Sequence, residues 1–131
     1  MKGEDTRPMA PPWLRGKTRQ ARVTAAALDY EGRITLDLAL LEAAGIGEFK
    51  RVQGVDLEHG RRLATYALPA PHGPGRIQVN GAAAHLILKG DRGITISYAW
   101  VPEPLPSGCH PRVALVDDRN QIREVHHAPV H

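Results

Sequence analysis

The stretch Gly-Ile-Thr-Ile-Ser-Tyr-Ala at residues 93–99 alternates large apolar residues with small or polar ones, most clearly at Ile94, Ile96 and Tyr98. Successive side chains of a β-strand point to opposite faces, so this period of two predicts a strand. Glycines and prolines bound nearly all of the other β-rich stretches. We therefore predict further strands over residues 20–24, 34–38, 62–68, 76–80 and 113–117.

Two short helices are expected to interrupt these strands. The first is predicted over residues 38–44, because Asp37 can cap its first turn and Gly45 can adopt the left-handed conformation that ends a helix. The second is predicted over residues 81–88, after Asn80. Many short strands with few helices favour a small closed barrel, since closure removes exposed strand edges. The expected fold class is mainly β.

The chain has 131 residues, which fits one compact domain. The first twelve residues mix prolines with charges of both signs and have no periodicity, so we expect a flexible arm over residues 1–12. We expect the barrel over residues 13–124 and a flexible tail over residues 125–131. The tail contains His126 and His127, but a terminal pair without a third ligand is more typical of a solvated tail than of a metal site. No metal site is expected.

Composition narrows the possible partners and location. Lys and Arg number 17 against 14 Asp and Glu, and aromatic residues make up only 5%, so neither a basic patch nor stacking platforms for nucleic acid are expected. No apolar run approaches the roughly 20 residues of a membrane-spanning helix. The N-terminus lacks an apolar signal-peptide stretch. A single cysteine, Cys109, excludes an internal disulfide. A cytoplasmic protein without nucleic-acid or membrane partners is expected.

Several short motifs occur in an order and spacing that resembles one known family. They include Leu-Asp-Tyr-Glu-Gly at residues 28–32, Leu-Glu-Ala-Ala-Gly-Ile at residues 41–46 and Asn-Gly-Ala-Ala-Ala at residues 80–84. From about Trp13 to Ile122 the chain resembles aspartate 1-decarboxylase, the pyruvoyl enzyme of β-alanine and pantothenate synthesis. This resemblance implies a double-psi β-barrel, assembled as a homotetramer with sites between neighbouring subunits.

Position 33 departs from that family. In the family, a serine after the Tyr-Glu-Gly stretch attacks the preceding glycine carbonyl, and elimination and hydrolysis leave a pyruvoyl group at a new N-terminus. This chain has Arg33 after Gly32. Arginine has no β-heteroatom that can be nucleophile and then leaving group. Gly32–Arg33 is therefore a degenerate cleavage site, and no pyruvoyl cofactor is expected. Thr35 has a hydroxyl but follows Ile34 instead of glycine, so we expect no cleavage there.

Other positions match the family's site. By resemblance, Lys17 and Arg62 hold the substrate carboxylate, which suits an arginine fork beside a lysine charge. Tyr66 matches the residue that returns a proton after decarboxylation. Arg19 stands where the family usually has histidine, and Thr65 and Asn80 match residues that shape the processing site. The alternative is that Arg19 and Arg33 point to solvent and that the other residues pack or cap the barrel. The predicted site has Tyr66 as its catalytic residue and, for substrate binding, Lys17, Arg19, Arg33, Arg62, Thr65, Asn80, Ala82 and Ala83.

Three functions follow from these residues. The first, which we expect, is an uncleaved, cofactor-free enzyme of cyclase, dehydratase or isomerase type in a biosynthetic pathway. It would act on a small anionic or carboxylate substrate through Tyr66 beside Lys17 and Arg62. The second is a non-catalytic tetrameric binding or scaffold protein. The third is a true aspartate 1-decarboxylase, which needs an electron sink for the carbanion left by carbon dioxide.

Overall fold

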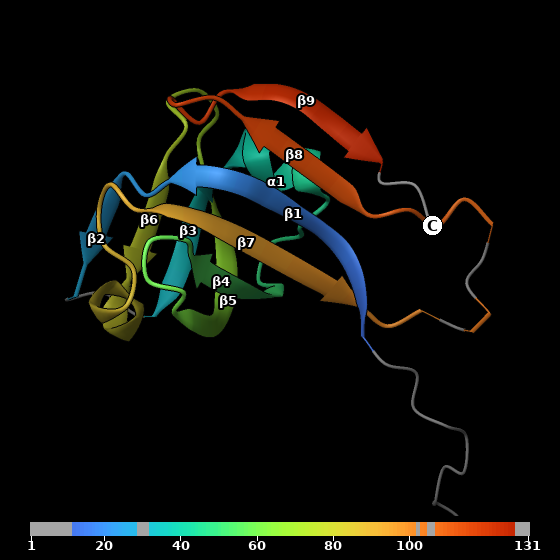
Figure 1. Ribbon diagram of the computed structural model, residues 1–131, viewed down its shortest axis with the longest axis horizontal. Coiled ribbons are helices and arrows are strands. Elements are labelled where there is room, and N and C mark those ends of the chain that lie inside the picture. The colour runs from blue at the N-terminus through green and yellow to red at the C-terminus, as the bar shows by residue number, and fades with distance from the viewer. Residues whose placement is uncertain (1–11, 29–31, 102, 105–106, 128–131) are drawn as a thin grey trace, which may run out of the picture.

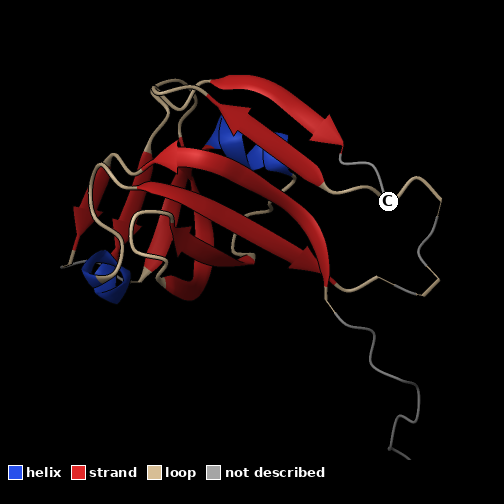
Figure 2. Ribbon diagram, in the orientation of Figure 1, coloured by secondary structure: helices blue, strands red, loops and turns tan. Residues whose placement is uncertain are grey.

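The computed structural model describes residues 12–28, 32–101, 103–104 and 107–127. Within them, one mixed sheet has the strand order β2-β6-β3-β5-β4-β7-β1-β8-β9, and it curves around a common interior (Figures 1 and 2). The expected mainly β architecture is confirmed. Its strands are β1 (Trp13–Arg22), β2 (Ala25–Ala27), β3 (Arg33–Asp37), β4 (Arg51–Asp56), β5 (Arg62–Ala70), β6 (Ile77–Asn80), β7 (Arg92–Ala99), β8 (Arg112–Val116) and β9 (Ile122–His127).

The core lies between the strands and the helix α1 (Leu38–Ala44), which sits below β8 in Figure 1. Leu36 of β3 and Leu40 of α1 are among its fully buried side chains. Glycine is required at position 16, because a Cβ there would lie 1.8 Å from the carbonyl oxygen of Ala44. The absence of a side chain on Gly16 therefore allows α1 to pack directly against β1.

Helix α1 has the predicted bounds and the predicted caps. The carboxylate of Asp37 accepts a hydrogen bond at Oδ1 from the Ala39 backbone N–H at 2.8 Å. Its Oδ2 accepts two more, from Gly73 at 3.0 Å and Gly75 at 2.8 Å. Gly45 ends the helix with φ +70°. Asp37 thus starts the helix and also fixes the loop between β5 and β6.

The side chain of Asn120 joins three segments of the chain through hydrogen bonds. Its side-chain Nδ2 donates to the carbonyls of Arg22 and Gly75, both at 2.8 Å. Its Oδ1 accepts from the Arg22 backbone N–H at 2.7 Å. The turn between β8 and β9 is thereby attached to the end of β1 and to the loop before β6.

Some predicted bounds need correction. The helix predicted over residues 81–88 is a shorter 3-10 helix, η1 (Gly81–His85). Strands β2, β4 and β9 were not predicted, and β9 continues to His127, into the segment expected to be a flexible tail. Residues 1–11 of the predicted arm and residues 128–131 lie outside the described residues. Among the residues described, no helix combines the length and apolar character needed to span a membrane.

Candidate functional site

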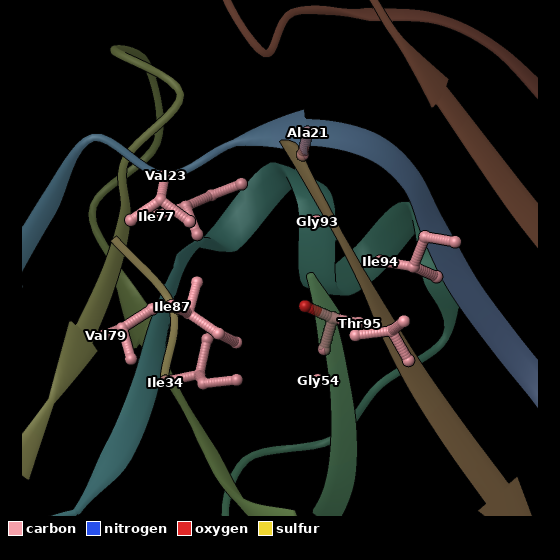
Figure 3. Close-up of a pocket in the computed structure, with 11 residues that line it drawn as sticks. Ala21, Val23, Ile34, Gly54, Ile77, Val79, Ile87, Gly93, Ile94 and Thr95 are labelled. Atoms are coloured by element: carbon pink, nitrogen blue, oxygen red, sulfur yellow. The ribbon is translucent and has the colours of Figure 1, made fainter. Parts of the chain in front are cut away.

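Among the described residues, the barrel interior contains a cavity that is too small for a substrate. Figure 3 shows its cavity, about 20 Å³ in volume, with Thr95 as the only polar residue in an otherwise aliphatic and glycine lining. A volume of this size is close to the minimum that holds one water molecule. Chemistry on a small molecule therefore has to take place on the outside of the barrel.

Three of the predicted site residues lie in a row across neighbouring strands. Arg33 of β3 pairs with Asn80 of β6. On the other side of β3, Ile34 pairs with Ala67 of β5, so one position earlier Arg33 is next to Tyr66. Residues directly opposite each other on paired strands share a face of the sheet. We call Asn80, Arg33 and Tyr66 the site row; it lies on the face opposite to the core residues Ile34 and Ala67.

Side-chain hydrogen bonds fix one end of the site row. Gln78 Nε2 donates to Asn80 Oδ1 at 2.9 Å, and Asn80 Nδ2 donates to the Thr35 hydroxyl at a long 3.5 Å. By contrast, the Nε of Arg33 is buried and has no hydrogen-bond partner among residues 12–28, 32–101, 103–104 and 107–127. A buried N–H donor without an acceptor is costly, so this nitrogen favours the binding of a group that supplies an oxygen.

Tyr66 forms the other end of the row. Its ring stacks on Phe49, with centroids 6.0 Å apart and an angle of 26° between the planes. Tyr66 is half-buried, whereas Phe49 is 66% exposed. This stacking holds the phenol ring in place and leaves the aromatic face of Phe49 uncovered.

The predicted carboxylate clamp is not assembled next to Tyr66 within one chain. Arg62 is exposed at the start of β5, four residues before Tyr66, which corresponds to about 13 Å along a strand. Lys17 is half-buried on β1, three strands from β5, or about 14 Å across the sheet. The pairings that connect them run from Lys17 to Ile96, then to Gln53, then to Ala64. Lys17 and Arg62 thus share the outer face but not a pocket.

The remaining predicted site residues are spread around the barrel. Arg19 is exposed on β1. Thr65 is half-buried and pairs with the core residue Val52, so its side chain points to the face opposite from Tyr66. In η1, Ala82 is exposed and Ala83 is buried. The structure therefore brings together Asn80, Arg33 and Tyr66, and leaves Arg19, Thr65 and Lys17 apart from them.

The residues at the expected cleavage bond do not fit formation of a pyruvoyl group. Gly32 is exposed, and a Cβ added to it would meet no atom within 4 Å. Arg33, which follows, has no hydroxyl or thiol to attack the Gly32 carbonyl. Residues 29–31, which include Tyr30 and Glu31 of the motif, lie outside the described residues. No step of a mechanism is therefore assigned to a pyruvoyl group at this bond.

A second cluster of ionisable groups was not predicted. Asp56, His59 and Asp91 place one potential ligand atom each within 4.8 Å of one another. Burial raises the pKa of Asp56, and the nearby carboxyl of Asp91 raises that pKa further. The carboxyl of Asp56 in turn lowers the pKa of Asp91. Asp91 is far from Asp56 in sequence, and only the pairing of β4 with β7 brings the two together.

Known proteins resemble the chain over most of its length. A protein of Halorhodospira halophila is 45% identical over 111 residues, which are 85% of this chain and 88% of that protein. Relatives in Carboxydothermus hydrogenoformans and Clostridium beijerinckii are 42% and 46% identical, and cover 90% and 86% of this chain and 93% and 90% of their own length. All three are named aspartate 1-decarboxylase.

These relatives overturn the function that we expected from the sequence. Seven proteins at 42–46% identity carry the same name, aspartate 1-decarboxylase. This contradicts both the uncleaved, cofactor-free cyclase, dehydratase or isomerase and the non-catalytic scaffold. It supports an enzyme of the lyase class. Our prediction was wrong because it relied on a single residue, Arg33. The similarity to the relatives extends over most of the chain.

The family is shown by a second comparison. The family model described as aspartate decarboxylase matches residues 9–123, which include every described strand except the last residues of β9. The mixed sheet, with α1 packed against it, is the double-psi β-barrel that the resemblance implies. The chain therefore belongs to the aspartate decarboxylase family.

Proposed function

We propose that this chain is an aspartate 1-decarboxylase, which converts aspartate to β-alanine and carbon dioxide. The observation that carries the proposal is the 42–46% identity, over most of the chain, to relatives with that name. The site row supports it, because a proton donor lies beside a cation and an amide on one face of the sheet. The substrate class is a small amino acid with two carboxylates.

Each residue of the site row is assigned one role in this reaction. When the bond from Cα to the departing carboxylate breaks, its electron pair is left on Cα, and a proton must replace carbon dioxide there. We assign this proton to the Tyr66 hydroxyl, which regains it from solvent. The carboxylate that is kept is assigned to the guanidinium of Arg33, whose Nε has no partner among the residues that the structure describes. Asn80 is assigned to orient the substrate by hydrogen bonding.

The electron pair left on Cα also needs an electron sink. A carbonyl cofactor would supply such a sink when bound. We propose that this carbonyl does not arise at residue 33, because the side chain there has no oxygen or sulfur. This proposal rests only on the chemistry of the arginine side chain. It does not depend on the roles assigned to Tyr66 and Asn80.

We also propose that the functional unit is a homotetramer. Phe49, Tyr98 and Trp100 are 66%, 44% and 65% exposed, and Trp100 and Tyr98 line a groove of about 560 Å³ on the outer face of β4, β5 and β7. Exposed aromatic groups of this kind are typical of interfaces. A neighbouring subunit seated here would bring a second Lys17 or Arg62 to the site row, which supplies the cations that one chain leaves distant.

The proposed function is tested with the purified full-length chain and aspartate. Formation of β-alanine is followed by amino-acid analysis, with glutamate as a substrate of the same charge that is one methylene longer. We expect β-alanine from aspartate and a much lower rate with glutamate. Light scattering of the same sample should give the mass of four chains. Unchanged aspartate in an assay with a folded tetramer would overturn the proposal.

A further inference from the structure

Asp56, at the end of β4, is a buried carboxylate with only half of its hydrogen-bonding capacity used. It is fully inaccessible to solvent. Its Oδ1 accepts from the backbone N–H groups of Glu58 at 2.7 Å and His59 at 3.2 Å. Its Oδ2 is buried and has no hydrogen-bond partner within the part of the chain that the structure describes. A buried carboxylate oxygen without a partner is costly, so a positive group is expected beside it.

Two further donor groups surround the same point. The side chain of Asp91 is 16% exposed, that of His59 is 41% exposed, and His59 Nε2 lies 3.5 Å from Asp91 Oδ2. Asp91 Oδ2 also accepts a hydrogen bond from the Leu88 backbone N–H at 3.2 Å. One ligand atom from each of Asp56, His59 and Asp91 lies within 4.8 Å of the other two. The cluster therefore offers two carboxylates and an imidazole around one point.

We propose that Asp56, His59 and Asp91 bind a divalent transition-metal cation of the Zn²⁺ type. Imidazole together with carboxylate oxygens suits Zn²⁺ better than Mg²⁺ or Ca²⁺, which prefer oxygen ligands alone. Zn²⁺ bonds of 2.0–2.2 Å in a tetrahedron separate neighbouring ligand atoms by about 3.3 Å, close to the observed separation of His59 and Asp91. Water completes the coordination on the exposed side of His59.

The arginine next to Asp91 in the chain pairs with a carboxylate outside the cluster. Arg92 follows Asp91 in the chain, but its Nε donates to Glu58 at 2.8 Å at the surface. Arg92 Nε is therefore engaged with Glu58 and does not pair with the two carboxylates of the cluster. Ligands from the turn after β4 and from the segment before β7 make the cation a cross-link between segments distant in sequence. A ligand that binds only the folded state stabilises that state, so the metal is expected to raise the melting temperature.

The test is titration of the EDTA-treated, desalted full-length chain with ZnCl₂ by calorimetry, with thermal melts in parallel. Because His126 and His127 are adjacent in β9, the His126→Gln/His127→Gln variant is used as the background. We expect one Zn²⁺ per chain and a higher melting temperature in that background, and no such response to MgCl₂.

Two variants and a matched control decide the outcome. His59→Gln and Asp56→Asn should each weaken Zn²⁺ binding at least tenfold, since each removes a ligand. His59 is on the surface, so its variant keeps the fold intact. His72→Gln removes another exposed histidine that is 2.6 Å from a carboxylate, that of Glu42, and should leave the affinity unchanged. Absence of stoichiometric binding, or equal affinities in His59→Gln and its background, would overturn the proposal.

Discussion

The two ends of strand β3 place charged side chains in opposite situations. At one end, both oxygens of Asp37 are occupied, by three backbone N–H groups at 2.8–3.0 Å. At the other end, Arg33 has a buried Nε for which the described part of the chain offers no partner. Four positions along β3 thus separate a carboxylate whose two oxygens both accept hydrogen bonds from a guanidinium whose Nε has no partner among the described residues. The comparison indicates that the Asp37 end stabilises the barrel, and it supports the proposal that the Arg33 end binds the substrate.

The largest effect on stability is expected at the Asp37 end of β3. Asp37→Ala leaves three backbone donors without their charged acceptor, and each such hydrogen bond contributes about 1.5–3 kcal/mol. We expect the free energy of unfolding to fall by at least about 3 kcal/mol. Denaturant unfolding at a fixed protein concentration measures it, with the exposed Asp118→Ala as the matched control at less than about 0.5 kcal/mol. If Asp37→Ala lowered the free energy of unfolding as little as the control does, Asp37 would not stabilise the barrel as we infer.

The next effect concerns catalysis beside Arg33. Tyr66→Phe keeps the stacking on Phe49 and removes only the hydroxyl, so stability should change by less than about 1 kcal/mol. Decarboxylation should slow by about 10²-fold or more, because the proton donor is lost, while KM changes little. Tyr98→Phe is the matched control, since that hydroxyl donates to Gln53 at 2.9 Å on the same outer face. Equal rates for the two variants would show that Tyr66 is not the donor.

The smallest effect on stability is expected at Arg33 itself. Arg33→Met keeps much of the side-chain length and removes the Nε that lacks a partner, so the free energy of unfolding should stay within about 1 kcal/mol of the wild type or rise. Its KM for aspartate should increase at least tenfold, because the carboxylate loses a charged hydrogen bond. A strong loss of stability would mean that Arg33 is structural, like Asp37.

Local signals in the sequence correctly predicted the structure around Asp37, at the end of β3. Asp37 and Gly45 set both ends of α1 in the expected way, because caps act within a turn of the helix. Strand β4 was missed because Gly54 interrupts its pattern. That glycine is explained by packing, since a Cβ there would lie 3.2 Å from Ile34 Cδ1 and 3.4 Å from Ile87 Cδ1. Strand β9 was missed because all of its residues are exposed, so pairing with β8 alone defines it.

The candidate site could be predicted only in part. The resemblance selected Tyr66, Asn80 and Arg33, and strand pairing places these three side by side. It also grouped them with Lys17 and Arg62, whose positions relative to the site row depend on register across several strands. The cluster of Asp56, His59 and Asp91 gave no signal, because its members come from two segments without a shared motif. Long-range pairing, which no local pattern specifies, accounts for these differences.

The most direct measurement of the proposed function is the position of new hydrogen in the product. Aspartate is incubated with the purified chain in D₂O, and the product is examined by NMR and mass spectrometry. Loss of the carboxylate next to the amine, followed by protonation from an exchanged Tyr66 hydroxyl, predicts β-alanine with one deuterium on the carbon that bears the amine. Alanine as the product, deuterium at the other carbon, or recovery of unchanged aspartate would contradict aspartate 1-decarboxylation at this site.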